Sequence, residues 1–144
     1  MPLISVTRLR PRRFWHVPLI LFDSLRITRQ VRRAEDFVGG YLAFGRGPSF
    51  WTVTVWRDLD AMRAFRNRNA HFAAMPTLLG RCDEASYTHW EQDAPLAPPP
   101  DEVRRRLQSD GRLSKVRRPS PEQTKGIACP EREPPVRRAE LRPA

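Results

Sequence analysis

One stretch, from Phe50 to Met75, constrains the fold more than any other part of the chain. It begins with Phe50-Trp51-Thr52-Val53-Thr54-Val55-Trp56, and Trp, Val and Thr favour a pleated, half-buried strand. Asp58 follows at the position of a helix N-cap, where its carboxylate can accept hydrogen bonds from free backbone N–H groups. The stretch therefore predicts a strand that leads into a helix. We expect residues 67–69 to weaken that helix and Pro76 to end it.

Both faces of this strand carry bulky side chains. Alternation places Phe50, Thr52, Thr54 and Trp56 on one face and Trp51, Val53 and Val55 on the other. A strand with two apolar faces is covered on both sides. We expect helices on one face and the sheet of a second copy on the other, because two such sheets can bury about 800 Å² each. The pattern predicts a homodimer.

The order of elements along the chain indicates the fold class. Strand patterns occupy residues 3–9, 41–44, 50–57 and 85–91, helical patterns occupy about 20–34, 58–75 and 101–110, and residues 113–117 form a possible edge strand. This β-α-β-β-α-β order is that of ferredoxin-like α+β folds, with an antiparallel sheet and helices on one face.

The first helical pattern is basic and amphipathic. Ile20, Ile27 and Val31 fall on one stripe, whereas Leu19, Leu21, Phe22 and Leu25 lie off it and are expected to be buried on a second side or to line a cavity. Residues 1–33 contain eight arginines and one acid, Asp23. Such a surface attracts anions of many kinds.

Composition divides the chain into two parts. Residues 1–118 read as one ferredoxin-like domain, whereas residues 119–144 hold six prolines and almost no apolar periodicity and are expected to be a disordered tail. The two cysteines, Cys82 and Cys129, are too few for a disulfide framework or a metal site, which favours a cytoplasmic location. No apolar run is long enough to span a membrane.

Three motifs carry a resemblance to a known group of proteins. The strand from Trp51 to Trp56, the helix segment Asp60-Ala61-Met62-Arg63-Ala64-Phe65 and the later Ala70-His71 with Met75 resemble the dimeric α/β barrel superfamily, specifically its antibiotic-biosynthesis-monooxygenase-like proteins. The resemblance covers about residues 3–118 and is strongest to a branch similar to spheroidene monooxygenase. It implies the dimeric barrel fold, whereas activities differ within the superfamily.

The candidate site residues follow from this resemblance and from residue chemistry. In haem-degrading relatives a histidine after an alanine near the end of this helix ligates iron, and Ala70-His71 matches that pair; otherwise His71 packs or caps a helix end. Asn69 could donate a hydrogen bond to a bound oxygen or enolate, although asparagine more often ends a helix. We expect Trp51, Trp56 and Phe65 to bind an apolar substrate, with core packing as the alternative. His89, on a strand beside Trp90, is expected to be structural.

Two functions remain open on this basis. The first is a monooxygenase, either free of cofactors or associated with haem, that acts on an apolar aromatic or isoprenoid-like small molecule. The alternative is a non-catalytic dimeric module that binds a small ligand or an anion. RNA-recognition folds share the same order of elements, but the chain lacks their aromatic strand motif and carries its charge in the first helix region, which argues against nucleic acid.

Overall fold

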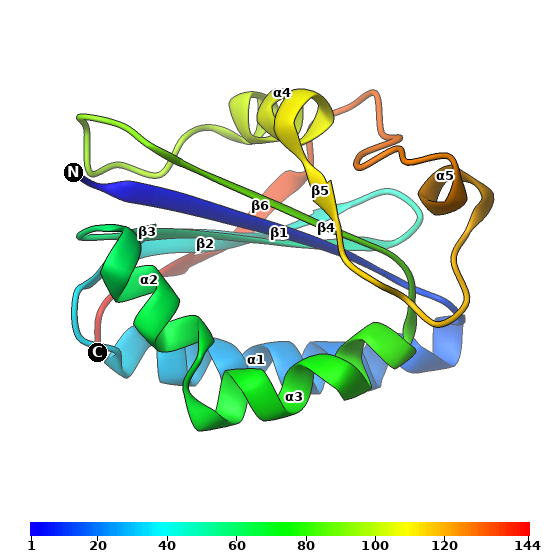
Figure 1. Ribbon diagram of the computed structural model, residues 1–144, viewed down its shortest axis with the longest axis horizontal. Helices are drawn as coiled ribbons and strands as arrows, with labels where there is room; N and C mark the ends of the chain where they lie inside the picture. Colours follow the sequence, from blue (N-terminus) through cyan, green and yellow to red (C-terminus); the bar gives the residue numbers. More distant parts are fainter.

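A six-stranded antiparallel sheet forms the centre of the structure (Figure 1). The computed structural model describes the backbone of residues 1–144 and the side chains of residues 1–68 and 75–144. The sheet has the order β5-β4-β1-β3-β2-β6. Its strands are β1 (Leu3–Pro11), β2 (Phe37–Gly45), β3 (Ser49–Trp56), β4 (Cys82–Glu91), β5 (Arg112–Leu113) and β6 (Val136–Leu141). The middle four strands have the ferredoxin-like arrangement, so the predicted fold class is confirmed.

Helices lie on both sides of this sheet (Figure 1). On one side, the helical face, are α1 (Val17–Arg33) with the 3-10 turn η1 (Phe14–His16) before it, α2 (Leu59–Arg66) and α3 (Asn69–Gly80). On the opposite face are α4 (Pro100–Asp110) and the short α5 (Pro121–Thr124). Within the described residues, no helix combines the length and the apolar character needed to cross a membrane.

The segment from β3 to α3 follows the sequence pattern with one exception. Asp58 is the N-cap of α2 and accepts a hydrogen bond of 2.8 Å from the backbone N–H of Ala61. The chain leaves the helix at Asn67 and re-enters it at Asn69, as expected. Pro76 was expected to end the helix but lies inside α3, which continues to Gly80. The expectation about Pro76 is therefore wrong.

Replacing Asp58 with alanine is expected to lower the midpoint of denaturant unfolding measurably. The N-cap hydrogen bond would be lost, and this bond also holds the pKa of Asp58 below its ordinary value. Denaturant unfolding of Asp58→Ala beside Asp60→Ala checks this, since Asp60 makes no cap hydrogen bond in the structure. Equal losses in the two variants would contradict the capping role.

The two sets of apolar residues in α1 lie in different environments. Ile20 and Val31 are buried against the sheet, which confirms the predicted inner stripe. Leu19, Phe22 and Leu25 are exposed, so the expectation that these residues are buried or line a cavity is wrong. The outer surface of α1 therefore carries apolar side chains in contact with solvent.

The opposite face of the sheet is covered by the chain itself. Val103 and Leu107 of α4, together with Cys129, pack on the sheet residues of one buried cluster, Ile4, Val6, Tyr41, Ala43, Trp51, Val53 and Val55. This is the face that was expected to pair with the sheet of a second copy. The homodimer stays a prediction, but it can no longer be based on an uncovered sheet face, because α4 and the C-terminal segment cover that face.

The C-terminal segment, residues 119–144, is ordered, so the prediction of a disordered tail is wrong. Strand β6 pairs with β2 and places Leu141 in the core. The side chain of Gln123 exchanges two hydrogen bonds of 3.2 Å with the backbone of Ala85, and the backbone carbonyl of Ala128 accepts from Ser86 Oγ at 2.6 Å. These anchors are polar and join distant parts of the chain, which is why apolar periodicity does not reveal them.

A buried group of charges holds this segment to the sheet. Arg8 and Glu84 are each 1% exposed, and Arg8 Nη1 lies 2.9 Å from Glu84 Oε1. Arg8 Nη2 lies 3.0 Å from Glu131 Oε1, and Ser120 Oγ donates to Glu84 Oε2 at 2.8 Å. Ser120 and Glu131 of the C-terminal segment thus contact buried charged groups on β4 and β1. These contacts matter because leaving a buried charge unpaired would cost stability.

Candidate functional site

A row of polar side chains crosses the middle of the helical face of the sheet. Pairing in register places Ser5 of β1 between His89 of β4 and Thr54 of β3. The next pair of positions places Thr7 between Tyr87 and Thr52. Directly paired residues of antiparallel strands point to the same face. We call these six residues the polar row: Ser5, Thr7, Thr52, Thr54, Tyr87 and His89.

Apolar clusters lie at both ends of the polar row. One contains Leu3, Phe37 and Trp56 with residues of α1 and α2, and the other contains Leu9, Ile20 and Leu78 with residues of β4. Five of the six side chains of the polar row are partly exposed, and only Thr54 is buried. Side chains beneath helices are normally apolar and closed to solvent, so the polar row marks the part of this interface that is not packed as core.

His89 is the titratable group of the polar row with a shifted pKa. Partial burial and then the positive charges of Arg112, Arg63 and Arg66 lower the pKa of His89 below its ordinary value of 6.5. Its imidazole is therefore neutral near pH 7 and can accept a proton. Two of these arginines, Arg63 and Arg66, belong to α2, so this helix brings positive charge toward the imidazole on the helical face of the sheet.

Two of the predicted substrate-binding residues adjoin the polar row. Trp56 Nε1 donates a hydrogen bond of 2.9 Å to Thr54 Oγ1, which fixes the indole against the row. The ring centroids of Phe65 and Trp56 lie 5.2 Å apart. Trp51 points to the opposite face of β3, where it is buried and its Nε1 donates to Ser49 Oγ at 3.0 Å. The structure thus brings Trp56 and Phe65 together and separates Trp51 from them.

The two predicted catalytic residues, Asn69 and His71, lie in the first turn of α3. Their side chains fall outside the described residues. Their roles stay predictions.

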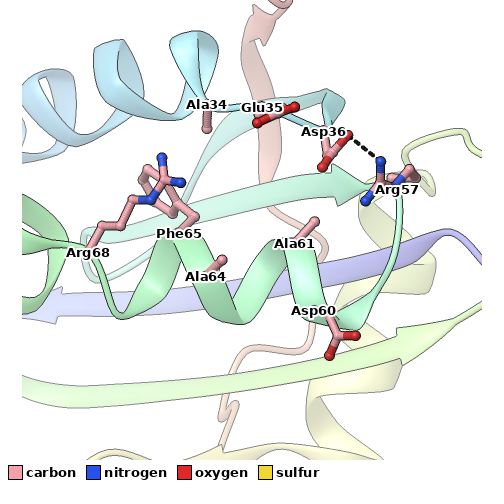
Figure 2. Close-up of a pocket in the computed structure, with 9 residues that line it drawn as sticks. All are labelled: Ala34, Glu35, Asp36, Arg57, Asp60, Ala61, Ala64, Phe65 and Arg68. Carbon is pink, nitrogen blue, oxygen red and sulfur yellow. Dashed lines mark ion pairs between the residues drawn. The ribbon is translucent and has the colours of Figure 1, made fainter.

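A pocket of about 240 Å³ lies beside α2, on the outer side of Phe65 (Figure 2). Its lining residues come from the connection between α1 and β2 and from residues 57–68, which contain α2: Ala34, Glu35, Asp36, Arg57, Asp60, Ala61, Ala64, Phe65 and Arg68. Figure 2 shows Arg68 and Phe65 at one end and the pair Asp36 and Arg57, 2.8 Å apart, at the other. The pocket is smaller than most ligand pockets of roughly 300–1,000 Å³, so the polar row remains the better candidate site.

The described side chains do not provide a metal site, because no group of three His, Cys, Asp or Glu residues lies together among them. The residue expected to ligate haem iron, His71, is outside that part of the chain. The only described histidine at the candidate site, His89, stands among small hydroxyl side chains and next to arginines. Haem association therefore stays a prediction.

Sequence reasoning missed most of the polar row. Thr52 and Thr54 share a face with Phe50 and Trp56, and Tyr87 and His89 alternate with Thr88 and Trp90. A signal was present, since polar residues occupy the centre of a strand face whose ends are apolar. What the sequence does not supply is the register that sets Ser5 beside His89.

Comparison with solved structures identifies the fold. No family model matches the sequence, and no curated protein matches it at a significant level. SnoaB, a cofactor-independent oxygenase from Streptomyces nogalater, is 17% identical with a TM-score of 0.55, and the match covers 65% of this chain and 94% of SnoaB. An antibiotic biosynthesis monooxygenase is 9% identical with a TM-score of 0.57, covering 64% of this chain and 99% of its own.

A third similar structure is Rv0793 from Mycobacterium tuberculosis, which is 12% identical with a TM-score of 0.58, covering 65% of this chain and 97% of its own. These matches span nearly all of the known proteins but leave about a third of this chain without a counterpart. At such identities the likeness concerns the fold. The chain has the ferredoxin-like fold of the antibiotic biosynthesis monooxygenase-like proteins.

Proposed function

We propose that this chain is a cofactor-independent monooxygenase that acts on an apolar aromatic or isoprenoid-like small molecule at the polar row. The observation that carries the proposal is the row itself: hydroxyl groups and one imidazole, partly open to solvent, in the centre of a sheet face that is apolar at both ends. Polar groups beneath helices cost stability unless they are hydrogen-bonded, and the partly exposed groups of the polar row are accessible for hydrogen bonds to a substrate.

The proposed reaction begins with proton transfer to His89. Its lowered pKa provides a neutral imidazole at physiological pH. Removing a proton from the substrate leaves an anion, and the positive charges of Arg63, Arg66 and Arg112 stabilise that anion through the same electrostatic effect that lowers the pKa of His89. Partial burial is the larger cause of the lowered pKa of His89; the arginine charges add to that shift and also stabilise the anion.

The ionised substrate then supplies the electrons for dioxygen. For a doubly activated methylene group, one oxygen atom of O₂ becomes the carbonyl of the product and the other leaves as water, so no further reductant is needed. Asn69 and His71 on α3 are proposed to contact the oxygen or the anion. The likeness to SnoaB, whose description is a cofactor-independent oxygenase, supports this class of reaction.

The apolar surroundings favour an apolar body for the substrate. Phe65, half-buried beside the buried Trp56, offers aromatic surface at one end of the polar row. The resemblance to spheroidene monooxygenase extends the proposal to isoprenoid-like molecules. No step of the proposal passes through a haem.

Replacing His89 with glutamine is expected to slow oxygenation at least about 100-fold, because general base catalysis typically contributes that much or more. Anthrone is a suitable probe, since its methylene group is acidic and its oxidation to anthraquinone and water can be followed by absorbance and oxygen uptake. The wild-type rate should fall as the pH drops through the lowered pKa of His89, where the imidazole becomes protonated. The variant should lack this dependence.

His16→Gln is the matched control, since His16 lies in the turn before α1 and away from the polar row. It should leave the rate and its pH profile unchanged. If the wild type consumes no oxygen with anthrone but binds it, as shown by quenching of the tryptophan fluorescence, the alternative of a non-catalytic binding module is favoured. Equal rates for the wild type and His89→Gln would contradict the role of His89.

A further inference from the structure

The outer surface of α1 and the turn before it combines exposed apolar and basic side chains. Phe14, Trp15, Leu19, Phe22 and Leu25 are between 44% and 80% exposed, which is high for side chains of this type. Trp15, Leu19 and Phe22 are spaced by four and three residues, so they form one row along the outer side of the helix. We call Phe14, Trp15, Leu19, Phe22 and Leu25 the apolar row.

Arginines border the apolar row at both ends. Arg13 precedes it, and its guanidinium carbon lies 5.5 Å from the ring centre of Trp15. Arg26 follows it and lies 6.0 Å from the ring centre of Phe22. The exposed side chains of α1 beyond Arg26 are Arg29, Arg32 and Arg33. The one acid of α1, Asp23, is paired with Arg81 at 2.7 Å, so the other charged residues of this helix, all arginines, leave it with a net positive charge.

We propose that this surface binds the face of an anionic lipid bilayer. The apolar row would enter the boundary between headgroups and acyl chains, and the flanking arginines would contact lipid phosphates. Helices that lie in a membrane interface combine Trp, Phe and Leu with Lys or Arg in this way. The inner stripe of α1 is already used by the core of the protein, so only the outer surface is free to meet the membrane. This inference does not depend on the proposed function.

Charge argues against a second copy of the chain as the occupant. The apolar row runs from residue 14 to residue 25, and an antiparallel pair of α1 helices centred on it would place residue 26 opposite residue 13. Both positions are arginine. A symmetric contact would therefore set Arg26 against Arg13 twice, and like charges in contact are unfavourable. A surface of lipid phosphates supplies the opposite charge instead.

The test is binding of the full chain to vesicles, measured by co-sedimentation and by tryptophan emission. Binding is expected to vesicles of phosphatidylglycerol and phosphatidylcholine in equal amounts, and to weaken in high salt. Vesicles of phosphatidylcholine alone should bind much less protein. Trp51 and Trp56 are buried and Trp90 is partly buried, so a blue shift of the emission that is lost in Trp15→Phe would report on Trp15. Trp15→Phe should abolish most of the shift and keep most of the binding.

Two double variants test the apolar row and the flanking arginines separately. Phe14→Ala with Phe22→Ala, and Arg26→Gln with Arg29→Gln, are each expected to weaken vesicle binding by more than about tenfold. All four side chains are exposed, so circular dichroism should show an unchanged fold. The matched controls are Leu96→Ala, at a residue 70% exposed elsewhere on the surface, and Arg132→Gln with Arg138→Gln in the C-terminal segment; both should bind as the wild type does.

Four outcomes would overturn the proposal. The first is no binding to anionic vesicles, and the second is equal binding by the wild type and both double variants. The third is sedimentation equilibrium that shows a dimer in the wild type and a monomer in Phe14→Ala with Phe22→Ala, which would assign the apolar row to contact between copies. The fourth is strong binding to vesicles of phosphatidylcholine alone that is equal for the wild type and for Arg26→Gln with Arg29→Gln, which would exclude anionic lipid as the partner.

Discussion

Deletion of residues 119–144 is expected to lower the free energy of unfolding by at least about 5 kcal/mol, enough to unfold many domains of this size. Two losses add together. Arg8 would lose Glu131, and Glu84 would lose Ser120, which leaves buried charge less well satisfied. The apolar cluster of the opposite face would also lose Cys129, and the apolar cluster of the helical face would lose Leu141.

Denaturant unfolding of residues 1–118 beside the full chain measures this effect. Deleting only residues 143–144 is the control, because it removes one backbone hydrogen bond, from Ala144 N to Arg32 O, and little buried surface. The shorter deletion should change stability by less than about 1 kcal/mol. Similar unfolding midpoints for the full chain and for residues 1–118 would show that the C-terminal segment does not stabilise the domain.

Replacing Arg8 with methionine is expected to cost about 3–5 kcal/mol at pH 7, the usual effect of removing one member of a buried ion pair. The substitution keeps an unbranched side chain but leaves Glu84 and Glu131 without the guanidinium between them. The exposed pair Arg46 and Glu133, 3.2 Å apart, provides the control. Arg46→Met should cost less than about 1 kcal/mol, since exposed ion pairs contribute little.

The loss at Arg8 should depend on pH in a defined direction. Burial alone would raise the pKa of Glu84, but the hydrogen bond from Ser120 and the charges of Arg8 and Arg10 outweigh it and hold that pKa below 4.5. In the wild type this lowered pKa adds stability above the ordinary pKa, and the contribution is lost as the pH falls through the lower value. Without Arg8 the pKa of Glu84 rises, so the carboxylate contributes less stability at neutral pH than in the wild type. The difference in stability between the two proteins should therefore shrink from pH 7 toward pH 4. A difference that grows over this range would contradict the assigned role of Arg8.

The fold was predictable where local chemistry agrees with periodicity. Asp58 before an apolar helical pattern, and the alternation from Phe50 to Trp56, place a strand and a helix close to their observed bounds. The C-terminal segment was not predictable in this way. Gln123, Ser120 and Glu131 hold it through hydrogen bonds to residues far away in the sequence, and polar contacts over such separations leave no periodic signal.

The candidate site was predictable only in part. Phe65 and Trp56 follow from the resemblance and lie together, whereas Trp51 belongs to the other face of the same strand. A lone histidine on a strand is usually structural, and His89 was expected to be structural for this reason. Its proposed role as a base rests on the strand register that places it beside Ser5 and on the charges of Arg63 and Arg66 in α2. Neither the register nor the approach of α2 can be deduced before the strands are paired.

Strand β6 also determines what lies at the margin of the sheet. Without it, the outer margin of β2 would present the unpaired backbone of Tyr41-Leu42-Ala43-Phe44, and an open apolar strand is a template on which further chains add and aggregate. With β6 in place, the margin instead carries Arg137, Arg138 and Glu140, all exposed. The opposite margin, β5, has two residues. The molecule thus ends in a charged strand on one side and a very short strand on the other, and both discourage growth of the sheet from one copy to the next.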